Sequence, residues 1–190
     1  MRQILVYDSP TRVFHWLLAA TVIASVVTAK IGGNAMAWHI RLGLLALALL
    51  AFRVVWGFVG GHWSRFAAFI YSPSSLLAYL RGDSGPNGRF DVGHSPLGAL
   101  SVFALLLLLI VQVATGLVAD DEIATTGPLN RFVETALALK ATGWHKAVGQ
   151  YLIITMVVLH IAAVLFYLFK KQRNLIAPMW HGDKHLAPGT

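Results

Sequence analysis

The sequence predicts an all-α fold: an integral membrane four-helix bundle, antiparallel in an up-down-up-down order, with both termini in the cytoplasm. The first observation is composition, because 57% of the 190 residues are hydrophobic and only 12% are charged, whereas soluble domains carry roughly 25% charged residues. The second is a set of four long apolar runs, which backbone hydrogen bonding in lipid forces to be helical. The third is the position of the basic residues at the ends of these runs, where they set orientation.

Each apolar run is long enough to cross a bilayer core of about 30 Å. The runs are continuously apolar rather than alternating, which argues against strands. The first run contains His15 and lacks a convincing cleavage site before Lys30, so we expect a span rather than a signal peptide. The length fits a single domain over residues 1–190. The expected spans are residues 12–30, 38–59, 95–118 and 145–169, joined by a turn at 31–37 and loops at 60–94 and 119–144.

The loop charges predict the orientation. By the positive-inside rule, the termini and the 60–94 loop are expected in the cytoplasm and the 119–144 loop in the periplasm. The chain is therefore expected to be a multi-pass membrane protein with its N- and C-termini on the inner side. Ten basic residues lie on the predicted inner side (Arg2, Arg12, Arg53, Arg65, Arg81, Arg89, Lys170, Lys171, Arg173 and Lys184), against five on the outer side (Lys30, Arg41, Arg131, Lys140 and Lys146).

Two loop segments mix apolar and polar positions. Residues 64–81 are expected to lie on the membrane surface, and residues 128–141 are expected to form a short amphipathic helix. The 60–94 loop also contains a turn-rich stretch, RGDSGPNGRFDVG.

Charge and cysteine content exclude several classes of function. The net charge of +7 does not indicate nucleic-acid binding, because the basic residues do not cluster on a soluble module and lipid headgroups explain their positions. The chain has no cysteine, which excludes covalent c-type haem, all-cysteine iron–sulfur clusters, disulfides and thiol catalysis. Any redox chemistry therefore needs a non-covalent cofactor or a partner.

Four histidines in the apolar runs lie at two depths. His145 and His160 are 15 residues apart on one expected helix, which is a rise of about 22 Å and a return to within about 60° of the same face. His15 lies near the inner end of the first span, and His39 opens the second from outside. Depth therefore pairs His39 with His145. It also pairs His15 with His160, whose depths agree to within roughly two helical turns. Two imidazoles per site suit two bis-histidine haems, whereas zinc needs three or four converging ligands.

The alternative for any one of these histidines is a packing residue hydrogen-bonded to a neighbour, although ionisable groups within spans are functional candidates by default. Three of the four histidines are followed, one helical turn later, by a small residue. These small residues would leave room for a flat macrocycle, but ordinary helix packing in membranes explains them equally well. The residues four positions on are Ala19, Gly43, Gly149 and Val164. His94, which opens the third span, has no depth-matched partner and is expected to be a cap or surface residue, with quinone contact as the lesser alternative.

Basic residues near the histidines are candidate partners for haem propionates. Arg53 follows His39 by 14 residues and lies about 21 Å deeper, at the level of the inner haem. An equally good explanation is a positive-inside anchor whose guanidinium reaches the headgroups. Arg41 and Lys146 flank the outer histidines, and Arg12 is a further candidate cofactor-binding residue.

The ordered motifs resemble those of the bacterial cytochrome b561 / nickel-iron hydrogenase cytochrome b family. They are RVFHW, WHIRLGLLALALLAFRVVWGFVG, SRF, GHSPLGAL, WHKAVGQYLIITMVVLHI and RNLIAPMWHG, and they span nearly the whole chain. The resemblance implies four transmembrane helices in the cytoplasmic (inner) membrane of a bacterium, two haem b groups ligated by the four paired histidines, and electron exchange with a ubiquinone or menaquinone pool. Ser95 stands where asparagine looks more usual in the family. Some hydrogenase-type members have an additional span, so this chain is nearer the b561 form.

The expected function is therefore that of a transmembrane di-haem b-type cytochrome between the quinone pool and a periplasmic partner. That partner would be a c-type cytochrome or a dehydrogenase or hydrogenase subunit. One alternative is a superoxide oxidase, in which Lys30, Arg41 and Lys146 steer a small anion; the acidic residues 120–122 favour a basic partner protein instead. A second alternative is a non-redox membrane scaffold. The sequence leaves open the oligomeric state and whether the chain is an enzyme or an electron-transfer subunit.

Overall fold

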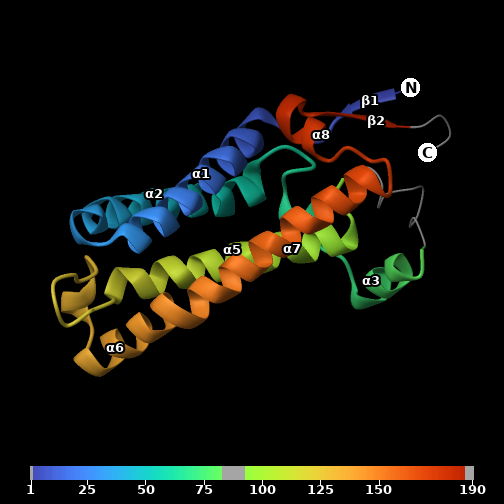
Figure 1. Ribbon diagram of the computed structural model, residues 1–190. Helices are drawn as coiled ribbons and strands as arrows, with labels where there is room; N and C mark the ends of the chain where they lie inside the picture. The colour runs from blue at the N-terminus through green and yellow to red at the C-terminus, as the bar shows by residue number, and fades with distance from the viewer. Residues whose placement is uncertain (1, 83–92, 187–190) are drawn as a thin grey trace. The chain divides into compact units, whose positions relative to one another are not determined.

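The computed structural model describes residues 2–82 and 93–186 (Figure 1). Arg89 and most of the turn-rich stretch thus lie outside the described residues. Four helical segments in the described part are long and apolar enough to cross a membrane. The predicted class, an all-α membrane protein with four spans, is thereby confirmed, while the antiparallel order and the cytoplasmic termini stay predictions. The segments are Ser9–Ile31, Gly33–Val59, Pro96–Val118 and Thr135–Phe169.

The first three spans correspond to the helices α1 (Ser9–Ile31), α2 (Met36–Val59) and α5 (Pro96–Val118). A short 3-10 helix, η1 (Gly33–Ala35), replaces the expected turn between α1 and α2. Helix α5 starts after Ser95, whose side-chain oxygen accepts a hydrogen bond from the backbone N–H of Gly98 at 3.2 Å.

The fourth span is longer than the apolar run suggests. Helix α6 (Thr135–Gly143) continues into a π-helical turn, η5 (Trp144–Gly149), and then into α7 (Gln150–Phe169). The structure therefore differs from the expected separate amphipathic helix at 128–141, because the helix begins at Thr135 and runs without a break into the span. A further 3-10 turn, η4 (Asn130–Phe132), precedes it.

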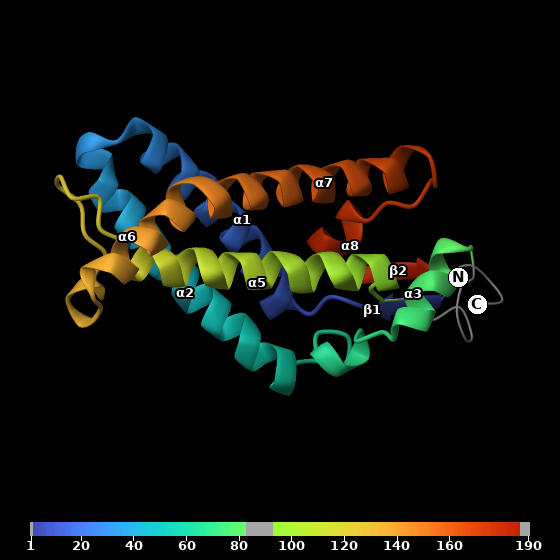
Figure 2. The same cartoon turned by 90° about the horizontal axis from the view of Figure 1, so that it is seen from below.

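The ends of the chain pair with each other, a feature that the sequence analysis did not anticipate. Strand β1 (Arg2–Leu5) runs antiparallel to β2 (Asp183–Leu186), as Figures 1 and 2 show, and α8 (Ile176–His181) leads into β2. Strands of four residues carry too little alternation to be recognised in a sequence. Residues 64–81 form η2 (Phe66–Ala68) and α3 (Pro73–Leu80), which is capped by the Ser72 hydroxyl.

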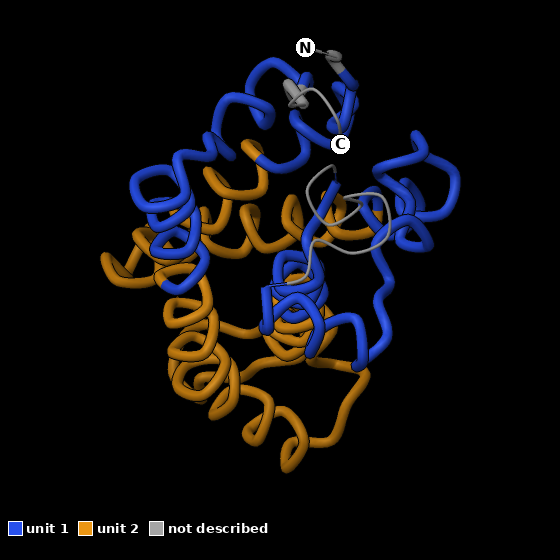
Figure 3. Tube along the Cα trace, turned by 90° about the vertical axis from the view of Figure 1, so that its right-hand side faces the viewer, with its two compact units in different colours: residues 1–15, 52–104, 159–190 blue, residues 16–51, 105–158 orange. Residues whose placement is uncertain are grey.

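The chain divides into two compact units, coloured separately in Figure 3. Unit 1 comprises Met1–His15, Phe52–Ala104 and Leu159–Thr190, and unit 2 comprises Trp16–Ala51 and Leu105–Val158. Unit 1 thus contains the start of α1, the end of α2, the start of α5 and the end of α7. Unit 2 contains the opposite end of each helix. Each of the two expected histidine pairs falls within a single unit.

A stripe along α2 shows what these helices bury. Ala46, Leu50, Arg53 and Gly57 are buried, at a spacing of three and four residues that keeps them on one helix face. Most of the large apolar side chains of the spans are exposed instead. Such a surface suits contact with lipid, and it makes a buried charged side chain within a span conspicuous.

Candidate functional site

The inner pair of histidines lies in unit 1. His15 of α1 and His160 of α7 have ring centroids 6.5 Å apart, with 50° between the ring planes. Both side chains are partly buried. This is the inner pairing expected from helix spacing; the role of the two residues as iron ligands stays a prediction.

The outer pair lies in unit 2, where the ring centroids of His39 and His145 are 5.9 Å apart and the planes are at 77°. The Nδ1 of His39 lies 2.9 Å from the carbonyl oxygen of Ser25 on α1. The Nδ1 of His145 lies 2.8 Å from the carbonyl oxygen of Gln112 on α5. Because a carbonyl only accepts, each Nδ1 carries the proton and donates, which leaves Nε2 with the lone pair that a metal needs.

Gln112 is a residue that the sequence analysis missed. Its side-chain Nε2 donates to the backbone carbonyl of His145 at 2.9 Å, so Gln112 contacts His145 through both its main chain and its side chain. His145 itself sits in the π-helical turn η5, and such turns often occur at functional sites. The available signal was a lone amide within the otherwise apolar run LLLLLIVQVATGLV.

Arg53 is buried in unit 1, with only 4% of its surface exposed. Its guanidinium lies over the ring of Phe66, 4.8 Å from the ring centroid, and a Cβ at Gly57 would collide with that ring. Within the described residues the Nη1 of Arg53 has no hydrogen-bond partner. This burial favours a role within the protein over that of a headgroup anchor, and contact of Arg53 with a cofactor stays a prediction. A buried cation with an unused donor fits an acidic group of a bound cofactor.

Asp8, also missed from sequence, organises the start of α1. Its carboxylate accepts hydrogen bonds from the backbone N–H of Thr11 at 2.9 Å, the Ser64 hydroxyl at 2.8 Å, the Trp56 indole at 3.1 Å and the backbone N–H of Gly61 at 3.3 Å. Partial burial acts to raise the pKa of Asp8, but the hydrogen bonds outweigh it and lower the pKa below its ordinary value. The carboxylate thereby joins the start of α1 to the end of α2.

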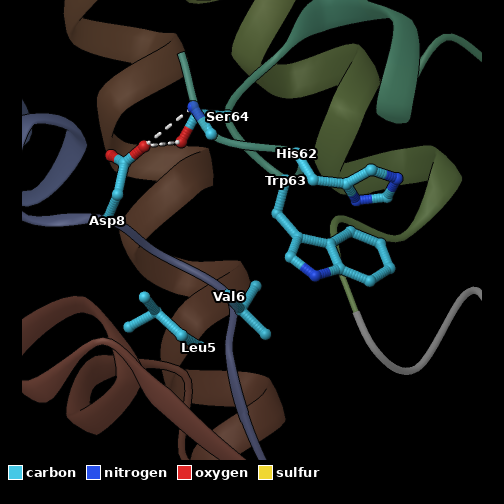
Figure 4. A pocket seen from close by; sticks show the side chains of 7 residues that line it. Leu5, Val6, Asp8, His62, Trp63 and Ser64 are labelled. Atoms are coloured by element: carbon cyan, nitrogen blue, oxygen red, sulfur yellow. Dashed lines mark hydrogen bonds between the residues drawn. The ribbon is translucent and has the colours of Figure 1, made fainter.

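A pocket of about 250 Å³ opens beside this network, as Figure 4 shows. The Asp8 carboxylate forms part of its wall, but its oxygens already accept bonds from Ser64 and the other donors. The wall therefore offers an anionic surface rather than a proton donor. The lining residues are Leu5, Val6, Asp8, Gly61, His62, Trp63 and Ser64.

Neutralising Asp8 should destabilise the junction between the start of α1 and the end of α2 in a pH-dependent way. Because the folded pKa is depressed, the ionised carboxylate stabilises the fold above the unfolded pKa of about 3.9, and this contribution is lost as the pH falls through the folded value. We expect Asp8→Asn to lower the free energy of unfolding by about 1–2 kcal/mol at pH 7, since charge-assisted bonds become neutral. Thermal unfolding in detergent between pH 3 and 8 measures the difference.

The matched control is Glu134→Gln, at a helix N-cap where the carboxylate makes no side-chain capping bond. It should leave stability unchanged over the same range. A difference between wild type and Asp8→Asn that did not shrink on acidification would contradict the assigned role of the Asp8 charge.

The remaining predicted basic residues are less buried than Arg53. Arg12 donates from Nη1 to the carbonyl of Trp180 at 2.5 Å and from Nη2 to the Ser9 hydroxyl at 2.9 Å, so it anchors the end of α8. Arg41 is exposed and stacks over the Trp38 ring at 4.9 Å, and Lys146 is exposed beside His145. Contact of these three with a cofactor stays a prediction.

His94 differs from the expectation of a cap or surface residue. Its ring packs 4.5 Å from that of Phe69 and 5.5 Å from that of Tyr7, and its carbonyl accepts a hydrogen bond from Tyr71. The capping function belongs to Ser95. Contacts with aromatic side chains therefore account for the position of His94.

The two histidine pairs and their surroundings fit haem b. Two imidazoles that bind one iron at about 2.0 Å per nitrogen place their ring centres roughly 6.3 Å apart, close to the 6.5 and 5.9 Å observed. A Cβ at Gly43, one turn after His39, would meet nothing within 4 Å, so that face is open. Gly149 is different, because a Cβ there would meet the side chains of Gln112 and Trp144. Helix packing, rather than room for a macrocycle, explains that glycine.

Comparison with known proteins agrees with this chemistry. A family model described as prokaryotic cytochrome b561 matches residues 6–182. A probable Ni/Fe-hydrogenase 1 B-type cytochrome subunit of Escherichia coli (strain K12) is 24% identical over 93% of this chain and 88% of its own length. Probable Ni/Fe-hydrogenase B-type cytochrome subunits of Cupriavidus necator and Bradyrhizobium diazoefficiens are 23% and 21% identical, over 93% and 94% of this chain and 85% of each relative. No solved structure matches the chain.

Proposed function

The chain belongs to the prokaryotic cytochrome b561 family, and from this premise we propose that it carries single electrons across the membrane between two haem b sites. Membership, together with the four apolar helices, makes it a multi-pass bacterial membrane protein and a b-type cytochrome of electron transfer. We propose His15 and His160 as the ligands of an inner haem, and His39 and His145 as the ligands of an outer one. The observation that carries this proposal is the separation of the two ring pairs.

Haem b held between two imidazoles supplies one-electron transfer with no open coordination position. The residues of the chain would hold the haems and orient their ligands. The carbonyls of Ser25 and Gln112 hold the outer imidazoles in the tautomer that presents Nε2. Arg53 would neutralise a propionate of the inner haem through its unused donor. The proposed inner site takes one ligand from α1 and one from α7, and the proposed outer site takes one from α2 and one from η5. The fourth span, which contains both η5 and α7, would therefore supply one ligand to each haem.

The proposed exchange partners are the quinone pool and a redox protein on the periplasmic face. The termini and the 60–94 loop would face the cytoplasm, as the loop charges indicate. The printed names of the relatives describe them as hydrogenase subunits, so a hydrogenase or another dehydrogenase is the favoured partner over a free c-type cytochrome.

An acidic loop in unit 2 favours a protein partner over a small anion. The Asp121 carboxylate accepts hydrogen bonds from the backbone N–H groups of Thr125, Ala124 and Ile123 at 2.7–3.1 Å, and these lower its pKa to about 2. Asp121 therefore stays ionised at any physiological pH. A fixed negative charge in the unit of the outer histidines opposes the approach of superoxide and attracts a basic protein surface.

Electron exchange with quinol tests the function directly. On rapid mixing of the purified, haem-loaded protein with a short-chain quinol, we expect both haem absorption bands to become reduced in the millisecond-to-second range. Mixing with superoxide should reduce them far less efficiently. Efficient reduction by superoxide with the reduced protein then passing electrons to quinone would instead establish the superoxide oxidase. A purified protein without haem absorption would establish the scaffold.

A further inference from the structure

The face of α5 that contacts the His145 ring carries a glycine, Gly116, and so has no Cβ at this position. Gly116 lies one helical turn after Gln112, whose carbonyl accepts the Nδ1–H of His145. A Cβ at Gly116 would lie 2.7 Å from Cε1, 3.0 Å from Nδ1 and 3.4 Å from Nε2 of the His145 ring. The distances to Cε1 and Nδ1 are shorter than ordinary contacts of about 3.5–4.0 Å, whereas the distance to Nε2 is close to an ordinary contact. The edge of the imidazole therefore rests directly on the backbone of Gly116.

Helix geometry explains why a glycine is needed at this position. Side chains four residues apart lie on one helix face, so a Cβ at residue 116 would stand beside the route to the carbonyl of residue 112. Only a residue without a Cβ lets an imidazole from a neighbouring helix approach that carbonyl to 2.8 Å. The side-chain amide of Gln112 fixes the backbone of His145 at the same time. Gln112 and Gly116 together thus position both the ring and the main chain of His145.

We propose that Gly116 is a positioning residue of the outer haem site, whose missing Cβ sets the orientation of the His145 imidazole and thereby the redox potential of that site. The inference rests on the proposed function, because it concerns an iron ligand. A ring that donates from Nδ1 to a carbonyl is a more basic ligand and favours the oxidised iron. Displacing the ring weakens that hydrogen bond, so the potential of the outer site should rise.

Other glycines of unit 2 provide the contrast. A Cβ at Gly143 would meet nothing within 4 Å, so Gly143→Ala is the matched control for the general effect of replacing a helical glycine by alanine, which is stabilising. At Gly116 the obstructing atoms belong to a side chain that can rotate. Gly116→Ala is therefore expected to fold and to move the ring, rather than to unfold the helix.

Potentiometric titration of the haem-loaded variants, followed optically and by paramagnetic resonance, tests the proposal. In Gly116→Ala we expect the midpoint potential of one of the two components to rise. At the wild-type midpoint potential, the oxidised-to-reduced ratio of that component should fall at least threefold. Its low-spin paramagnetic resonance signal should also shift. The other component and the far-ultraviolet circular dichroism should match the wild type. Gly143→Ala should show neither change. Selective loss of that one haem with unchanged helix content would support the same positioning role.

Two results would overturn the role of Gly116. One is a Gly116→Ala protein whose components and signals match the wild type. The other is joint loss of both haems with loss of helix content, which would mark a merely structural glycine. A second variant, Gln112→Ala, removes the amide but keeps the carbonyl acceptor, so it should perturb the same component less than Gly116→Ala does. Failure of the proposed function is distinguishable, because the wild-type protein would then bind no haem.

Discussion

Replacing either His15 or His160 by alanine is expected to remove the same redox component and to leave the other intact. The two rings lie 6.5 Å apart within unit 1, and an iron that loses one of two axial imidazoles becomes high-spin or is not retained. Replacing His39 or His145, which lie 5.9 Å apart in unit 2, should remove the second component. Redox titration of the four purified variants, with optical and paramagnetic resonance detection, gives the grouping.

His94→Ala is the control within the same set of experiments. Its ring contacts aromatic side chains, with Phe69 at 4.5 Å and Tyr7 at 5.5 Å, so both components should persist. Loss of one component in both His15→Ala and His39→Ala would refute the pairing. Loss of a haem in His94→Ala, with none lost in His15→Ala, would show that His94 rather than His15 is an iron ligand.

Arg53→Gln is expected to lower the midpoint potential of the inner component. Removing a positive charge near an iron stabilises its oxidised form. At an effective dielectric constant of about 20, a unit charge on the order of 10 Å from a redox centre contributes on the order of 1–2 kcal/mol, or tens of millivolts for one electron, before screening by a propionate. The shift should therefore be tens of millivolts. It should appear in the component that His15→Ala removes.

Arg65→Gln is the control for the loss of a positive charge in the same unit, because Arg65 is exposed and water screens its charge. It should leave both midpoint potentials within a few millivolts of wild type. Arg53→Lys keeps the positive charge but loses the planar guanidinium. Its midpoint potential should therefore stay close to that of the wild type, while its affinity for haem should fall. A shift of the outer component alone in Arg53→Gln would contradict the placement of Arg53.

The sequence was sufficient to predict four spans and to predict which histidine rings lie close together. Continuous apolar runs determine where helices cross a membrane, and the rise per residue gives the depth of each side chain along its helix. These two properties pair His15 with His160 and His39 with His145 from the sequence alone. They could not give the separation of the rings, because that depends on how neighbouring helices pack.

The features that the sequence did not predict depend on contacts between segments far apart in the chain. Gly116 looks like an ordinary residue of an apolar helix, and the amide of Gln112 shows that a polar contact is needed but not with which residue. Both are explained by His145, some 30 residues later in the chain. Asp8 matches a helix N-cap locally, but its bonds to Trp56 and Ser64 are not visible in the sequence. The pairing of β1 with β2 likewise joins the two ends of the chain.

The number of haems per chain tests the central claim most directly. A pyridine haemochrome assay, combined with amino-acid analysis of protein purified from cells supplied with ample haem precursor, measures that ratio. Two histidine pairs with separations close to that of a bis-imidazole iron predict two haem b groups per polypeptide. A ratio of one, or none, in folded protein with intact helix content would contradict the account.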